Sequence, residues 1–108
     1  MNARHVLETA KELISHRDRW CRAALARDAE GVSIPPDWDE AASWCAQGAI
    51  GAIAPDPASD GRVYADVALR RAVPHGTPAG VNDHRGHKAT LAMVDRAIAI
   101  ATAATEQP

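Results

Sequence analysis

The sequence predicts a mainly α-helical fold, in which residues 1–108 form a single compact domain of four helices with a small β-hairpin near residues 20–34. Apolar residues recur at the spacing of a helical face in four segments of the chain. Alanine is abundant and phenylalanine is absent, which favours helices packed at short distances. A chain of 108 residues can bury one modest core. Together these observations predict a small bundle of helices.

The segment Asp37–Ala54 is predicted to be the central helix. Two prolines precede it, and proline lacks the backbone donor that a helix interior needs. Asp37 is a good N-cap, and Glu40 three residues later completes a capping box. Gly48 costs a helix about 1 kcal/mol relative to alanine, so we expect a neighbouring element to approach closely there. One face of the predicted helix carries Ala41, Trp44, Cys45, Gly48, Ala49 and Ala52.

Three further helices are predicted from their amphipathic patterns. The first covers residues 3–16, with an apolar stripe opposite charged residues and Asn2 as a plausible cap. The third runs roughly over 62–72, and the last runs from about His87 to Ala104 with an apolar inner stripe.

The remaining segments are predicted to be strands, turns and loops. Residues 20–26 and 32–34 are expected to pair as a hairpin around the turn at 28–31, where Gly31 is free to take a positive φ. A helical continuation from the first helix is the alternative for residues 20–26. Residues 74–80 are predicted to be a loop, and residues 82–86 a turn.

Composition narrows the classes of function. A net charge of −2 gives no general electrostatic reason to bind nucleic acid or an anionic membrane. No stretch has the roughly 18 apolar residues of a membrane-spanning helix, and the N-terminus does not resemble a signal peptide. We therefore expect a cytoplasmic protein. Cys21 and Cys45 could form one disulfide bridge, but in a reducing cytosol free thiols are the favoured interpretation. No motif indicates a cofactor.

Three segments of the chain together look familiar. They are residues 20–31, residues 42–49 with the Trp-Cys-x-x-Gly-Ala pattern, and Asn82-Asp83 followed by the helix that contains residues 95–98. In their order and spacing they resemble a small family of uncharacterised proteins of bacteria and their phages, a domain of unknown function. The resemblance extends from the first helix to Ala101, implies a complete domain and brings no known activity. Relatives tend to have a small hydroxyl residue near position 87, where this chain has histidine.

Cys45 is a candidate nucleophile, with His84 or His87 as its base. A catalytic cysteine needs a lowered pKa, which usually comes from an imidazolium or a helix N-terminus. Cys45 is predicted to lie in the third turn of its helix beside alanine and tryptophan. A buried, inert thiol is therefore the favoured interpretation.

A metal site is the second candidate. Asp83, His84 and His87 supply three ligand types, to which Cys21 or His75 could add a fourth. The spacing lacks a second paired motif, so exposed or capping histidines beside a turn are favoured, and no metal or cofactor is expected.

The pair Asn82-Asp83 is the third candidate, as a ligand contact across a cleft from the central helix. Asparagine and aspartate fix backbone turns far more often than they catalyse. A backbone-fixing role at the entry to the last helix is the first interpretation, and binding the second.

Exposed tryptophans are the last candidate. If Trp20 and Trp38 are not both buried, they would make anchors for a partner, whereas Trp44 is assigned to the core. The leading hypothesis is a small accessory or interaction protein that binds an unidentified protein or small ligand. An enzyme or metal-dependent site, formed by the 82–87 loop against the 37–54 helix, is one alternative. A structural homo-oligomer formed through the outer face of the last helix is the other.

Overall fold

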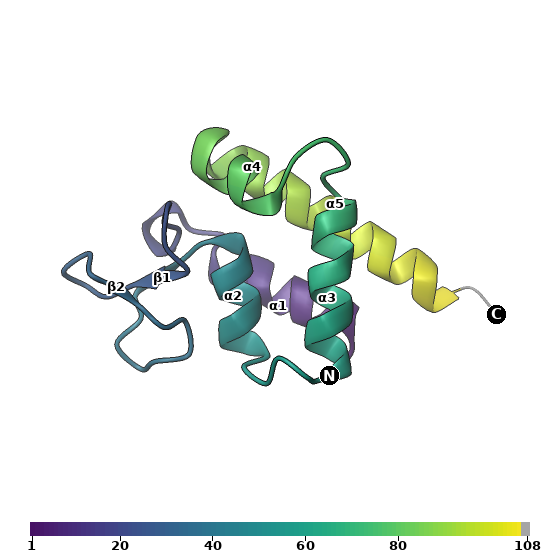
Figure 1. Ribbon diagram of the computed structural model, residues 1–108, viewed down its shortest axis with the longest axis horizontal. Helices are drawn as coiled ribbons and strands as arrows, with labels where there is room; N and C mark the ends of the chain where they lie inside the picture. Colours follow the sequence, from purple (N-terminus) through teal and green to yellow (C-terminus); the bar gives the residue numbers. More distant parts are fainter. Residues whose placement is uncertain (107–108) are drawn as a thin grey trace.

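The structure, a computed structural model, describes residues 1–106 and the side chains of residues 1–104. The fold is mainly α, as predicted, but the described part of the chain holds five α-helices where four were predicted (Figure 1). None of these helices has the length and apolar character needed to span a membrane. The elements in chain order are α1 (Ala3–Leu13), the short 3-10 helix η1 (Arg17–Arg19), β1 (Ala26–Arg27), β2 (Ser33–Ile34), β3 (Ser43–Trp44), α2 (Ala46–Ile53), α3 (Asp60–Arg71), α4 (Pro78–His84) and α5 (His87–Glu106).

The helices enclose one apolar core. In Figure 1, α2 and α3 lie side by side, α1 passes behind them, and the long α5 crosses behind α3. Helix α1 packs against α2, α3 and α5, so its apolar stripe forms the centre of the bundle. The largest apolar side chains with almost no exposure are Val6, Leu7, Ile14, Ile50, Leu69, Met93 and Val94.

A small antiparallel sheet lies at one end of the bundle, with strand order β2-β1-β3 (Figure 1). Ala26 pairs with Ile34 on one side and with Trp44 on the other. The predicted hairpin is therefore present but shorter than expected, and it gains a third strand. Residues 20–25 are neither helix nor continuous strand, so the helical alternative is wrong; Trp20 makes only an isolated bridge to Trp44. Gly31 takes a positive φ of 84°, as the turn required.

The start of the central helix was predicted wrongly. Helix α2 begins at Ala46 with Cys45 as its N-cap, so the capping box of Asp37 and Glu40 does not form. Cys45 is extended, with φ −78° and ψ 175°, and its Sγ accepts a hydrogen bond from the Gly48 amide at 3.2 Å. The residues that precede Cys45 form turns at 36–40 and then the strand β3 at 43–44.

Tertiary contacts explain this change. The backbone of Trp44 is in β3, paired with β1, and its indole Nε1 donates to the carbonyl oxygen of Pro36 at 2.9 Å. These bonds hold residues 36–44 in a loop and a strand, and helix propensity cannot offset them. The close approach expected at Gly48 is confirmed, because a Cβ atom there would overlap the carbonyl oxygen of Leu25.

The extra helix is α4 (Pro78–His84), which takes the place of the second half of the predicted 74–80 loop and most of the predicted turn at 82–86, while residues 74–77 form a loop as predicted. Thr77 is its N-cap and accepts a hydrogen bond from the Gly80 amide at 3.0 Å, while Pro78 occupies the first turn. Proline is favoured there because its missing donor would be unpaired anyway. Gly86, with φ 94°, then turns the chain into α5, which begins at His87 as predicted.

Candidate functional site

Asn82 occupies the centre of a buried hydrogen-bond network. Its side chain is 1% exposed, near the end of α4. The oxygen Oδ1 accepts hydrogen bonds from Trp20 Nε1 at 2.8 Å and from the Ala46 amide at 3.1 Å. The nitrogen Nδ2 donates to the carbonyl oxygen of Cys21 and to Asp83 Oδ1, each at 3.0 Å. All four hydrogen bonds that an asparagine side chain normally forms are therefore made.

The network joins segments that are far apart in the sequence. The amide of Ala46 is one of the first-turn donors of α2, which have no partner within the helix itself. Asn82 pairs this donor and at the same time holds the backbone and indole of residues 20–21. The backbone-fixing role expected of Asn82 therefore acts on α2 and on residues 20–21, rather than on the entry to the last helix. A ligand contact at Asn82 stays a prediction.

Asp83 fixes an unusual backbone conformation. Its Oδ1 accepts a hydrogen bond from the Ala23 amide at 3.0 Å in addition to the bond from Asn82. Ala23 has a φ of 59°, a left-handed conformation that is uncommon for a residue with a Cβ atom. These hydrogen bonds, that from Ala23 above all, hold the pKa of the Asp83 carboxyl below its ordinary value. The carboxylate is thus ionised and used as an acceptor for the backbone.

Trp20 is a half-buried part of the same network. The guanidinium of Arg22 lies 5.1 Å from the centroid of its indole ring, and the His87 ring lies 5.3 Å away at a 40° tilt. Nε2 of His87 is 2.6 Å from the carbonyl oxygen of Ile14, so this nitrogen must carry the hydrogen and donate it. The structure therefore brings Trp20, Asn82 and Asp83 together. The Trp20 indole donates a hydrogen bond inside the protein and is half-buried.

Both cysteines lie next to the network and are buried free thiols. The Cys21 amide donates to the carbonyl oxygen of Trp44 at 3.1 Å, which places Cys21 beside the residue preceding Cys45. A helix N-terminus usually lowers the pKa of a thiol, but burial dominates here and raises the pKa of Cys45. Burial likewise raises the pKa of Cys21. Such protonated thiols are poor nucleophiles at neutral pH.

The residues of the metal alternative are not brought together. His84 is exposed at the end of α4, whereas His87 directs Nε2 to the carbonyl oxygen of Ile14. Asp83 is engaged by the backbone of Ala23. Within the described residues, no group of three His, Cys, Asp or Glu side chains is placed to hold a metal ion.

A small cavity opens beside the network. Its volume is about 290 Å³, just under the usual range for small-molecule sites. Polar groups of Asn82 and Asp83 line it, but their hydrogen bonds are already made within the protein. The arrangement is better suited to positioning the backbone than to binding a ligand. The full lining is Ala23, Ala24, Leu25, Cys45, Gln47, Pro78, Ala79, Asn82 and Asp83.

Trp38 has a different environment. It lies on the loop of residues 35–42, here called the Trp38 loop. This loop connects β2 to β3 at the end of the molecule that carries the sheet (Figure 1). Its side chain is 53% exposed, and the acidic residues Asp37, Asp39 and Glu40 around it are exposed as well. Trp38 thus meets the condition set for a partner anchor, whereas Trp20 is held in the network.

The Trp38 loop is held by several hydrogen bonds. The carbonyl oxygen of Pro36 accepts from Trp44 Nε1 at 2.9 Å, and that of Trp38 accepts from the Ala41 amide at 3.1 Å. The Ala42 amide donates to the carbonyl oxygen of Arg27 in β1 at 2.8 Å. The loop therefore presents its tryptophan from an ordered backbone.

Two exposed apolar residues near the sheet were missed from the sequence. Leu25 is 51% exposed and Val32 is 57% exposed. Neither residue was singled out from the sequence. Alternation along the chain carries no signal for this exposure, because Val32 and Ile34 are two residues apart and would lie on the same face of a strand.

Comparisons with known proteins give a family and no activity. No curated protein and no solved structure matches this sequence. The profile of one family matches residues 1–100, which is nearly the whole chain. The chain therefore belongs to DUF6197, a family of unknown function.

Proposed function

We propose that this protein is a small interaction module that binds a protein partner through the Trp38 loop. The observation that carries the proposal is a tryptophan, 53% exposed, on an ordered loop. Tryptophan is among the residues most often found at the energetic centre of protein interfaces. A partner surface that fits this loop has an apolar pocket for the tryptophan, and basic residues surround that pocket.

Physical arguments support both parts of that surface. A buried aromatic side chain covers about 150–250 Å² and can contribute much of the binding energy of a small interface. An ordered loop loses little conformational entropy on binding. The carboxylates of Asp37, Asp39 and Glu40 would attract a basic partner, and salt would weaken that attraction.

Cytoplasmic location and a bacterial or phage origin belong to the proposal. The two free cysteines support a reducing compartment. Catalysis at residues 82–87 is less well supported, because the thiol of Cys45 is protonated and the side chain of Asn82 is fully hydrogen-bonded. Self-association through α5 would appear as a multiple of the chain mass in a native mass spectrum.

The test compares partner capture by the wild-type protein and by Trp38→Ala. Proteins retained from a bacterial lysate on each immobilised variant are quantified by mass spectrometry, at low and at high salt. Any protein retained by the wild type is then purified, and its dissociation constant is measured. Loss of an interface tryptophan typically costs at least about 2 kcal/mol, so we expect affinity to fall by about thirtyfold.

The matched control is Tyr64→Ala, which removes a 62% exposed aromatic residue from α3, away from the loop. It should leave the dissociation constant unchanged. Replacing Asp39 with lysine should weaken binding at low salt and have less effect at high salt. If the folded Trp38→Ala variant binds every verified partner as tightly as the wild type, tryptophan anchoring is wrong.

A further inference from the structure

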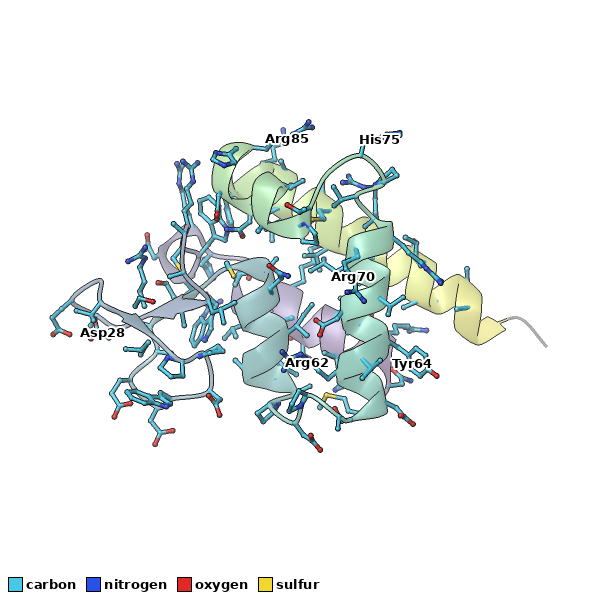
Figure 2. All side chains as sticks on the ribbon, viewed as in Figure 1. Asp28, Arg62, Tyr64, Arg70, His75 and Arg85 are labelled. Carbon is cyan, nitrogen blue, oxygen red and sulfur yellow. The ribbon has the colours of Figure 1, made fainter. Side chains whose placement is uncertain are left out.

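A second surface carries an open groove with a volume of about 870 Å³, here called the arginine groove. It lies between the end of α3, the loop that follows, α4 and α5. Figure 2 shows His75 and Arg85 on the same side of the molecule, the first from the α3–α4 loop and the second from the end of α4. The lining residues that determine its chemistry are Arg71, Arg85 and Arg96 on the basic side and Val73, Ala99 and Ile100 on the apolar side.

The charged side chains of this groove are all basic. Arg71, Arg85 and Arg96 line it, and no aspartate or glutamate does. Among the described residues, the ion pairs of the protein involve Arg4, Lys11 and Arg62, so none of the groove arginines has a carboxylate partner. The groove is therefore positively charged in a chain whose overall net charge is −2.

Helix ends offset only part of this charge. Helices α3 and α4 end at the groove, and each C-terminus carries roughly half a negative charge. Arg96 Nε donates a hydrogen bond to the carbonyl oxygen of Ala72 at 3.3 Å, so one N–H of its guanidinium pairs with a carbonyl group at the C-terminal end of α3. Three guanidiniums against two helix ends leave a net charge of about +2 in the groove.

Beside the cations, the groove has an apolar wall. Ala72 and Val81 are buried beneath it, and Val73 and Ile100 are partly exposed within it. The exposed Ala99 continues this surface along α5. An occupant therefore needs both an anionic group for the guanidiniums and an apolar body for the wall.

We propose that the arginine groove binds an amphipathic phosphate monoester. A phosphate monoester carries close to two negative charges at neutral pH and accepts bidentate hydrogen bonds from guanidinium groups. Its charge matches that of the groove, whereas a carboxylate neutralises only half of it. The volume lies within the range of about 300–1,000 Å³ that is usual for small-molecule sites. This site is separate from the Trp38 loop, and neither proposal depends on the other.

The test is a calorimetric titration of the full chain with octyl phosphate. Octanol has the apolar chain without a charge, so it tests the apolar wall alone. Inorganic phosphate has the charge without the chain, so it tests the cations alone. Octanoate replaces the phosphate with a carboxylate and tests that alternative. We expect one molecule of octyl phosphate per chain, with octanol, inorganic phosphate and octanoate each at least about tenfold weaker. Raising the salt concentration should weaken the binding of octyl phosphate.

Variants assign the binding to the groove. Arg96→Gln and Arg71→Gln should each weaken octyl phosphate by about tenfold, because each removes a charge-assisted hydrogen bond. Ala99→Glu places a carboxylate in the groove at an exposed helical position and should abolish binding while leaving the arginines intact. Arg17→Gln, on the exposed η1 segment, is the matched control and should bind as the wild type does.

Three results would overturn the proposal. These are no binding of octyl phosphate below millimolar concentration, equal binding of octanol, and equal losses in Arg17→Gln and Arg96→Gln. Octanoate binding as tightly as octyl phosphate would replace the phosphate with a carboxylate ligand and contradict the charge argument. Circular dichroism of each variant confirms that a loss of binding is not a loss of fold.

Discussion

Asn82 forms hydrogen bonds with four backbone and side-chain groups, so its removal leaves several of them without a partner. In Asn82→Ala, the indole nitrogen of Trp20, the amide of Ala46 and the carbonyl of Cys21 all lose a hydrogen bond. Each buried group left unpaired costs about 1–3 kcal/mol. We expect the free energy of unfolding to fall by about 3 kcal/mol or more, measured by urea denaturation followed by far-UV circular dichroism.

Gln47→Ala is the matched control for this experiment. Gln47 lines the same small cavity, but its amide is exposed to solvent. Removing such a group typically changes the free energy of unfolding by about 0.5 kcal/mol or less. Equal effects of the two substitutions would show that the Asn82 network does not hold the fold as described.

The carboxylate of Asp83 should make stability depend on pH in acid. Its pKa is lower in the folded protein than in the unfolded chain, chiefly because of the Ala23 amide. Its contribution is therefore fully present above the unfolded pKa, near 3.8, and is lost as the pH falls through the folded pKa. Asp83→Asn keeps the shape but makes weaker, neutral hydrogen bonds. We expect Asp83→Asn to be less stable than the wild type near pH 6.

The difference in stability between Asp83→Asn and the wild type should then narrow on acidification to about pH 3 and below. Urea denaturation at a series of pH values measures it. Asp39→Asn, on the exposed Trp38 loop, corrects for the removal of a surface carboxylate. A difference that stays constant down to the lowest pH would mean that the Asp83 charge contributes nothing to folding.

At the scale of single elements, prediction from sequence worked best for helices with a long amphipathic pattern. Helices α1, α3 and α5 were placed with their ends shifted by a few residues, because a repeating apolar stripe is a local property of the sequence. Helix α2 was misplaced because the pairing of Trp44 with β1 and its bond to Pro36 come from elsewhere in the chain. Periodicity alone does not report such contacts.

The Asn82 network was only partly predictable, again because its contacts join segments that are far apart in the sequence. Asn82 and Asp83 were singled out, but their partners Trp20, Ala23 and Ala46 lie 36–62 residues away, and no spacing rule connects them. By contrast, the signals for α4 were local. Thr77 followed by Pro78 is a cap and first-turn pair, and giving it more weight than the nearby glycines would have predicted this helix.

Close packing of α2 against residues 20–25 predicts an unusual response to a helix-favouring substitution. Alanine is better than glycine in a helix by about 1 kcal/mol, yet Gly48→Ala places its methyl group on the carbonyl oxygen of Leu25. Because backbone atoms cannot move aside cheaply, we expect a net loss of about 2 kcal/mol or more in the free energy of unfolding.

Gly51→Ala, in the same helix, is the control for Gly48→Ala. Its Cβ atom would lie 3.3 Å from a ring carbon of Pro36, which a small shift of the loop can relieve. We expect the free energy of unfolding to change by less than about 1 kcal/mol, measured by urea denaturation. A Gly48→Ala variant as stable as Gly51→Ala would show that α2 and Leu25 are not in contact.

On the scale of the whole molecule, the small sheet depends on the helices. Each of its strands has two residues, too few to be stable alone. Asn82 and Asp83 of α4 fasten the adjoining segment 20–23, and β3 leads directly into α2. One apolar core contains residues from all five helices. Sheet and bundle should therefore unfold together as one cooperative unit.

Two spectroscopic signals can test this cooperativity. In a Trp38→Phe background, tryptophan fluorescence comes from Trp20 and Trp44, where the sheet meets the helices, while far-UV circular dichroism reports the helices. We expect both signals to give the same urea midpoint and a slope of about 1–3 kcal/mol per molar. Ile50→Ala, which removes a side chain buried in the core, should lower both midpoints together because it costs about 2–5 kcal/mol. A fluorescence transition at lower urea than the circular dichroism transition would mean that the sheet detaches first, with the helical bundle still folded.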